Sequence, residues 1–184
     1  FVETFFRSIP DCSAVVDHWV EVLTGPRFIV NLPPGIQLVA SAPGYWKSPD
    51  RDNWGHMRLR ALLADVSSEE VLFQCSSIGF LPGSFLSDLS KSVNVRDHIR
   101  VAWPLYDVAM WKKGSNFLRF PSKHFEDGQF PLKVLTPLWL PSTRKKYLCH
   151  SKTMVSLPDN SWIYMGSHNL SQSAWGRLVR TTTT

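Results

Sequence analysis

The stretch HSKTMVSLPDNSWIYMGSHNLSQSAWG, residues 150–176, predicts a β-hairpin followed by a helix. Two strand-like runs flank Pro158 to Ser161, whose residue types (PDNS) all favour turns. If these four residues form the loop, Leu157 lies opposite Trp162. His150 would then face Asn169, and Lys152 would face Ser167.

This register would place four polar side chains on one face, because residues two apart in a strand point to the same side. A histidine can transfer a proton near neutral pH. A lysine supplies positive charge, while asparagine and serine supply hydrogen bonds. Such a set suits a phosphoryl group, whose transition state carries negative charge on its oxygens. A helix starting near Leu170 would add backbone N–H groups.

The predicted site requires no metal and no other cofactor, because no carboxylate cluster or histidine pair at metal spacing accompanies it. Simpler interpretations of the same residues exist. A single H-x-K is common on protein surfaces, and Ser-x-Asn before a helix is often only a cap. A shift of one residue in the hairpin would also scatter the four side chains between the two faces.

Strand-like and helix-like runs alternate through the rest of the chain, which predicts an α/β fold with a mixed β-sheet flanked by helices. The predicted helices span 1–9, 11–23, 53–66, 82–93 and 169–178. The predicted strands span 36–44, 70–79, 98–105, 132–140, 146–157 and 162–167.

The composition is that of a folded domain, with 43% apolar and 12% aromatic residues among 184. The net charge of +5 suits a polyanion such as nucleic acid, although charge alone does not establish one. The basic segment 107–130 is predicted to line a DNA groove or to be a solvated loop.

The sequence also bears on the cellular compartment of the protein and on whether the chain is complete. Three widely spaced cysteines predict neither a disulfide framework nor a zinc ribbon, and suggest reduced thiols in an intracellular protein. No apolar run approaches the roughly 20 residues that span a membrane, so no membrane partner is expected. The chain starts without Met, inside a predicted helix, and ends in RTTTT, so we expect a piece of a longer protein.

The combination H-x-K followed by G-S-x-N-L-S resembles the second half-site of the phospholipase D superfamily. Most members have Asp at the position that is Leu157 here, and its absence is typical of one branch, the tyrosyl-DNA phosphodiesterases. Residues 52–63 (DNWGHMRLRALL), 73–79 (FQCSSIG) and 166–176 (GSHNLSQSAWG) are similar to segments of that branch, in the same order.

The resemblance implies a phospholipase D-like half-domain at 36–184, truncated at its C-terminus, with 1–35 ending the preceding N-terminal half. It also implies a metal-independent DNA-repair hydrolase in the nucleus. Its substrate would be single-stranded or nicked DNA with a 3′-linked tyrosine or peptide, the remnant of topoisomerase I. The reaction would pass through a phosphohistidine.

The resemblance assigns roles to particular residues. His150 would be the general acid and base, and Lys152 and Asn169 would bind phosphate oxygens. Ser167, Ser76, Ser77 and Ser171 would contact the substrate, although Ser76 and Ser77 also suit a simple turn. Trp54 and His56 are predicted to be structural. No other H-x-K occurs in the sequence, so this chain is expected to be inactive alone.

Two alternatives stay open. A lipid hydrolase of the same superfamily would want Asp in place of Leu157, and an apolar lipid-binding face. A DNA-binding module that has lost catalysis would explain the missing first half-site, although the intact second half-site argues against such a loss.

Overall fold

The computed structural model describes residues 13–25, 32–42, 44–79, 81–102, 132–134, 150–159 and 161–179. The helix predicted at 1–9 and the basic segment 107–130 lie outside these residues, so they stay predictions.

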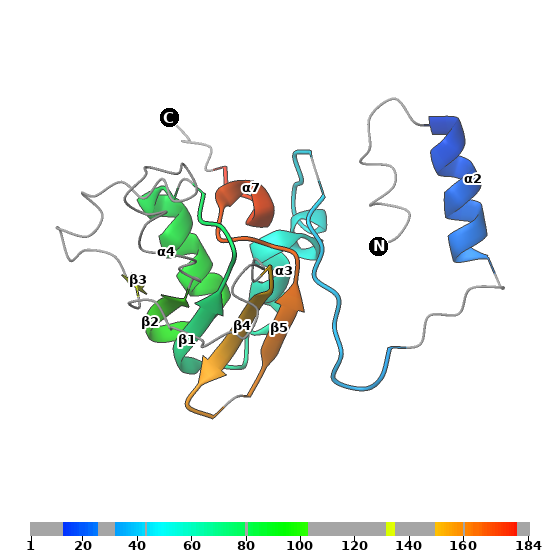
Figure 1. The fold of residues 1–184 in the computed structure, drawn as a ribbon. Helices are drawn as coiled ribbons and strands as arrows, with labels where there is room; N and C mark the ends of the chain where they lie inside the picture. Colours follow the sequence, from blue (N-terminus) through cyan, green and yellow to red (C-terminus); the bar gives the residue numbers. More distant parts are fainter. Residues whose placement is uncertain are drawn as a thin grey trace.

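A mixed five-stranded sheet in the order β3-β2-β1-β4-β5 forms the centre of the fold (Figure 1). The strands are β1 (Ser68–Gln74), β2 (Val95–Ala102), β3 (Leu132–Val134), β4 (Lys152–Leu157) and β5 (Ile163–Gly166). β1 pairs in parallel with β2, and β2 with β3. β4 is antiparallel to both β1 and β5. The prediction of an α/β fold with a mixed sheet is therefore confirmed.

The described helices are α2 (Ser13–Thr24), α3 (Gly55–Leu62), α4 (Gly83–Ser92) and α7 (Gln172–Trp175), with a 3-10 turn η1 (Asp50–Asn53) before α3. α3 and α4 form where apolar residues recur at helical spacing, and they bury those residues, as predicted. α2 lies apart from the sheet, and its Val15 and Trp19 are exposed (Figure 1). None of the described helices is both long and apolar enough to cross a membrane.

The core lies between one face of the sheet and helices α3, α4 and α7. Strand alternation explains its membership: Val71 and Phe73 of β1 are fully buried, whereas Leu72 between them is only partly covered. α4 adds Phe85 and Leu89 to the same core. Because apolar side chains must be buried on one face of the sheet, their positions determine which residues of each strand point toward the core.

Several predicted elements are wrong or too long; the strand predicted at 70–79, for example, ends at Gln74. The described residues 36–42 and 44 form no strand, and Ile36 and Leu38 are each 50% exposed. The segment instead binds the start of α3, where the Gly55 N–H donates to the Ala40 carbonyl at 2.8 Å. The helix predicted at 169–178 is confined to four residues, because Leu170 is extended and bridges to Ile78.

Candidate functional site

Three segments that carry predicted site residues meet at one edge of the sheet. β1 and β5 both run antiparallel to β4, so their C-terminal ends lie beside the N-terminal end of β4. Residues 75–79, 150–152 and 167–170 therefore converge. An isolated parallel bridge between Ile78 and Leu170 joins the first segment to the third.

The predicted hairpin is present, but its predicted register is wrong by one residue. Lys152 pairs with Gly166, not with Ser167, and Ser156 donates its N–H to the carbonyl of Trp162 at 3.2 Å. The loop is one residue longer than predicted because the Ser156 side chain organises it. The Ser156 hydroxyl accepts from the Trp162 N–H at 3.2 Å and donates to Asp159 Oδ1 at 3.3 Å. The regular hairpin ladder therefore does not bring His150 opposite Asn169.

Lys152 lies on the buried face of β4, and only 2% of its surface is exposed. Its ammonium group folds back and donates to the His150 carbonyl at 2.6 Å. The buried Cys75 directly follows β1, next to the Gln74–Thr153 pair that joins β1 to β4. Burial raises the pKa of the Cys75 thiol to about 11, while nearby backbone groups and the charge of Lys152 oppose that rise. The His150 side chain itself is exposed.

Asn169 is held by Ser76 rather than by the hairpin ladder. The Ser76 hydroxyl donates to Asn169 Oδ1 at 3.0 Å. The Gly79 N–H donates to the Leu170 carbonyl at 2.9 Å, and a Cβ on Gly79 would lie 2.6 Å from the Ser171 Cβ. The glycine is thus needed for the close approach of the two segments.

The remaining predicted serines have different surroundings. Ser171 caps α7, since its hydroxyl accepts from the Ala174 N–H at 3.1 Å. Ser167 is exposed, and Ser77 is half-buried with its backbone beside the Cys75 thiol. α7 has only four residues, too few for an effective helix dipole. The contacts of the three serines with a substrate stay predictions.

Sequence reasoning missed His168, the variable position of the G-S-x-N motif. His168 Nε2 lies 3.0 Å from the Ser41 hydroxyl, and Nδ1 is hydrogen-bonded to the Tyr164 hydroxyl. The imidazole also stacks on Trp175, with ring centroids 4.5 Å apart. The only signal in the sequence was a histidine placed between two motif residues.

The hydrogen bonds around His168 define its tautomer. Ser41 donates its hydroxyl to the Ala174 carbonyl, so it accepts from His168 Nε2–H. Nδ1 is then the acceptor for the Tyr164 hydroxyl. Burial lowers the pKa of His168, which agrees with a neutral ring. His168 thus ties the motif loop to the segment around Ser41.

The DNWGH segment packs into the fold, as its predicted structural role requires. Trp54 and His56 are both buried, and His56 Nδ1 is hydrogen-bonded to the Ser92 hydroxyl at 2.9 Å. Gly55 has a φ of +51°, and a Cβ there would lie 2.1 Å from the Trp175 carbonyl oxygen. This contact brings the DNWGH segment against the SAWG segment, which follows it by more than a hundred residues in the sequence.

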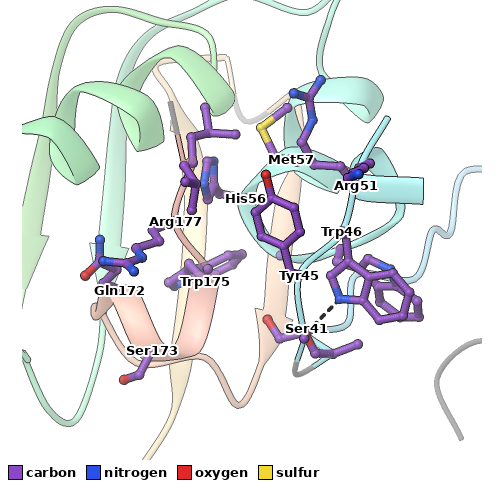
Figure 2. Close-up of a pocket in the computed structure, with 18 of the residues that line it drawn as sticks. Ser41, Tyr45, Trp46, Arg51, His56, Met57, Gln172, Ser173, Trp175 and Arg177 are labelled. Atoms are coloured by element: carbon purple, nitrogen blue, oxygen red, sulfur yellow. Dashed lines mark hydrogen bonds between the residues drawn. The ribbon is translucent and has the colours of Figure 1, made fainter. Parts of the chain in front are cut away.

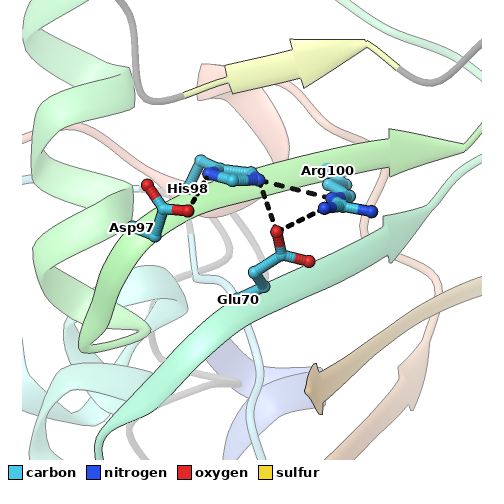
Figure 3. Close-up of polar contacts among 4 residues, drawn as sticks. All are labelled: Glu70, Asp97, His98 and Arg100. Atoms are coloured by element: carbon cyan, nitrogen blue, oxygen red, sulfur yellow. Dashed lines mark hydrogen bonds and ion pairs between the residues drawn. The ribbon is translucent and has the colours of Figure 1, made fainter. Parts of the chain in front are cut away.

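A second polar cluster spans β1 and β2 (Figure 3). Glu70 lies directly opposite His98, whose Nε2 is 2.6 Å from Glu70 Oε1 and whose Nδ1 is 2.7 Å from Asp97 Oδ2. Arg100 Nη2 approaches the same Glu70 oxygen at 2.5 Å. The ligand-type atoms of Glu70, Asp97 and His98 lie within 4.8 Å of one another. Because Arg100 already neutralises Glu70, the arrangement is that of an ion-pair network.

Comparison with known proteins identifies the family of this sequence. The family model described as Tyrosyl-DNA phosphodiesterase matches residues 30–184. Tyrosyl-DNA phosphodiesterase 1 of Arabidopsis thaliana is 27% identical over 205 aligned positions, which cover 88% of this chain. The chain spans 34% of the length of that relative.

Proposed function

The chain belongs to the tyrosyl-DNA phosphodiesterase family, and on that premise we propose that it supplies one half-site of a DNA-repair phosphodiesterase. The substrate is DNA whose 3′-phosphate is esterified to a tyrosine or a peptide, as left by topoisomerase I. Residues 36–184 are the C-terminal catalytic half in this proposal, and residues 1–35 end the N-terminal half. Action on chromosomal DNA places the enzyme in the nucleus.

The observation that carries the proposal is the hydrogen bond from Ser76 to Asn169. Because Asn169 Oδ1 accepts this bond, its Nδ2 amino group is oriented to donate to another acceptor. A phosphate oxygen is such an acceptor. Lys152, one strand away at the same edge, uses one N–H on the His150 carbonyl and has two more to donate.

His150 is the proton-transfer group in this mechanism. A nucleophilic histidine from the first half-site attacks phosphorus, forms the P–N bond and displaces the tyrosine oxygen. His150 donates a proton to that leaving oxygen, since a phenol has a pKa near 10 and leaves poorly as the free anion. Water then attacks phosphorus while His150 accepts its proton, and the P–N bond breaks, which frees the nucleophilic histidine and leaves a 3′-phosphate. Lys152 and Asn169 stabilise the charge on the phosphoryl oxygens in both steps.

This mechanism needs a histidine from each of two half-sites, and the sequence carries one H-x-K. We therefore expect the chain to bind substrate without turning it over. An inactive DNA-binding module is the competing proposal, favoured by the same single motif. The two differ in whether the site distinguishes a 3′-phosphotyrosyl end from a plain 3′-hydroxyl end.

The test compares binding of labelled oligonucleotides that end in 3′-phosphotyrosine, 3′-phosphate or 3′-hydroxyl. The proposal expects the two phosphorylated ends to bind more tightly than the hydroxyl end, and Lys152→Ala to remove that preference. Lys91→Ala, an exposed lysine on α4, is the matched control. Equal binding of all three ends would favour the non-catalytic module. Multiple turnover by the chain alone would show that a nucleophile lies within it.

A further inference from the structure

The imidazole of His168 is held by three separate segments of the chain. Its Nε2–H donates to the Ser41 hydroxyl at 3.0 Å, and its Nδ1 accepts from the Tyr164 hydroxyl on β5. Its ring stacks on Trp175 of α7. Ser41 and Trp175 lie together in the lining of one pocket (Figure 2). The variable position of the G-S-x-N motif is therefore the point at which β5, α7 and the segment before α3 are joined.

β5 places the Tyr164 hydroxyl directly against the motif loop. Tyr164 is the one buried residue of this strand, and a Cβ on Gly166 would lie 2.1 Å from the hydroxyl oxygen. The hydroxyl accepts from the His168 backbone N–H at 3.4 Å and donates to the His168 ring. Burial raises the pKa of Tyr164, so the hydroxyl keeps the proton that it donates.

Asn169 follows His168 directly, so the backbone that His168 holds is the backbone that presents the asparagine side chain. Ser76 holds Asn169 Oδ1, and the Ser171 N–H donates to the Asn169 carbonyl at 2.9 Å. Neither bond ties Asn169 to β5, whereas the contacts of His168 with Tyr164 do. A side chain that must meet a phosphate oxygen needs both of its ends held by such supporting contacts.

Only the neutral ring of His168 makes both hydrogen bonds. Ser41 already donates to the Ala174 carbonyl, so Nε2 carries a hydrogen and Nδ1 carries none. A proton added to Nδ1 would face the Tyr164 hydroxyl, whose own hydrogen would lose its acceptor. Among the contacts of the ring with described residues of β5, α7 and the segment at Ser41, only that with Tyr164 involves a titratable group. Acid therefore opposes this arrangement.

We propose that His168 is a positioning residue of the phosphate site, whose neutral imidazole holds the motif loop so that Asn169 donates to a phosphate oxygen. The inference rests on the proposed function and adds to it a residue that touches no substrate and acts through Asn169. Protonation of His168 should weaken recognition of the phosphate. The added positive charge alone would have the opposite effect, because it attracts an anion.

The experiment measures the ratio of affinities for oligonucleotides that end in 3′-phosphotyrosine and in 3′-hydroxyl, from about pH 7.5 to about pH 5.5, across the ordinary pKa of histidine. A phosphotyrosyl end is used because a phosphate monoester itself titrates at about pH 6. The unmodified chain is compared with His168→Asn, whose side-chain oxygen can accept from Tyr164 but does not titrate in this range. Any pH dependence that comes from His150 is common to both chains and cancels.

Relative to His168→Asn, the affinity ratio of the unmodified chain should fall about 2- to 10-fold in acid, the effect of losing one neutral hydrogen bond. Because burial lowers the pKa of His168, the midpoint of this fall should lie below 6.5. Circular dichroism at each pH checks that both chains stay folded. This comparison needs no variant that disturbs the stacking on Trp175.

Tyr164→Phe removes the donor to His168 Nδ1 and should lower the affinity ratio at neutral pH about 2- to 10-fold. His168→Phe keeps a ring against Trp175 and should lower the ratio at least as much. The double variant should lose no more than His168→Phe alone, because the two residues act as a unit. Tyr45→Phe, at an exposed tyrosine, is the matched control and should keep the ratio.

Two results would overturn the inference and leave the proposed function standing. One is an affinity ratio in the unmodified chain that follows that of His168→Asn at every pH, or rises above it in acid. The other is a full preference for the phosphotyrosyl end in Tyr164→Phe. If His168→Phe does not fold, the pH series and Tyr164→Phe decide. No preference for the phosphotyrosyl end in the unmodified chain at neutral pH would reject the proposed function, and the inference with it.

Discussion

Ser76 donates a hydrogen bond of 3.0 Å to the side-chain oxygen of Asn169, across 93 positions of sequence. This bond links the end of β1 to the motif loop after β5, two strands that are not neighbours in the sheet. Because it occupies Asn169 Oδ1, it determines which side of the amide can reach a phosphate. Ser76 thereby acts on the proposed site through another residue.

We expect Ser76→Ala to weaken binding of a 3′-phosphotyrosyl oligonucleotide about 2- to 10-fold, the effect of losing one neutral hydrogen bond. Ser76→Thr keeps the hydroxyl and should retain most of the affinity. Ser84→Ala on the exposed face of α4 serves as the matched control. Equal loss in the Ala and Thr variants would point to steric disturbance rather than to the hydrogen bond.

The two catalytic assignments can be separated in a complete enzyme that contains this half-site. His150→Ala should accumulate a covalent enzyme–DNA adduct, most clearly with a leaving group of low pKa. With such a leaving group, the first step needs no acid, whereas the water that attacks in the second step still needs a base. General acid–base catalysis typically accelerates a step about 10²–10⁴-fold. Lys152→Ala should slow both steps and accumulate none. A denaturing gel with labelled DNA measures the adduct, and the opposite pattern would reverse the two roles.

Gly55→Ala should destabilise the fold more than Gly35→Ala. Both glycines have a positive φ, +51° and +84°, so both substitutions bear the same kind of backbone strain. A Cβ at Gly35 meets nothing within 4 Å, whereas at Gly55 it meets the Trp175 carbonyl at 2.1 Å. The additional overpacking should cost about 1–3 kcal/mol, measured by urea unfolding. Equal costs would mean that the Gly55–Trp175 contact relaxes freely.

Stability should fall as the pH drops below about 6.5, the ordinary pKa of histidine. Burial lowers the pKa of both His56 and His168 in the folded chain. Between the ordinary pKa and the lowered one, the unfolded state binds more protons, so acid favours unfolding; above that window the two histidines contribute no pH dependence. His56→Asn should reduce the fall in unfolding free energy between neutral and mildly acidic pH.

Cys75 should resist thiol reagents in the folded chain. Its pKa is raised from 9.0 to about 11 by burial, which lowers the reactive thiolate fraction about 100-fold at pH 8, and no part of its surface is exposed. A Cys12→Ser, Cys149→Ser background leaves Cys75 as the single reporter. Its labelling should become fast only when denaturant is added. Rapid labelling of the native chain would mean that this end of β1 opens readily.

The amino-acid sequence by itself determined the elements with strong local signals. Turn residues at 158–161 specified a hairpin, and apolar spacing specified α3 and α4. The H-x-K and G-S-x-N motifs indicated the family, because their residue types at that spacing are rarely combined by chance. These signals act within a few residues, so they can be recognised without knowledge of the folded chain.

Tertiary structure alone decided where those residues lie. The hairpin register depends on the hydroxyl of Ser156 near the end of β4, which binds across the loop, and residue type does not reveal this contact. The segment predicted as a strand at 36–44 has the composition of a strand, yet its Ala40 bridges to Trp54 and accepts from the Gly55 N–H at the start of α3. The positions of Asn169 and His168 depend on Ser76 and Ser41, distant residues whose contacts form only when the sheet and helices pack together.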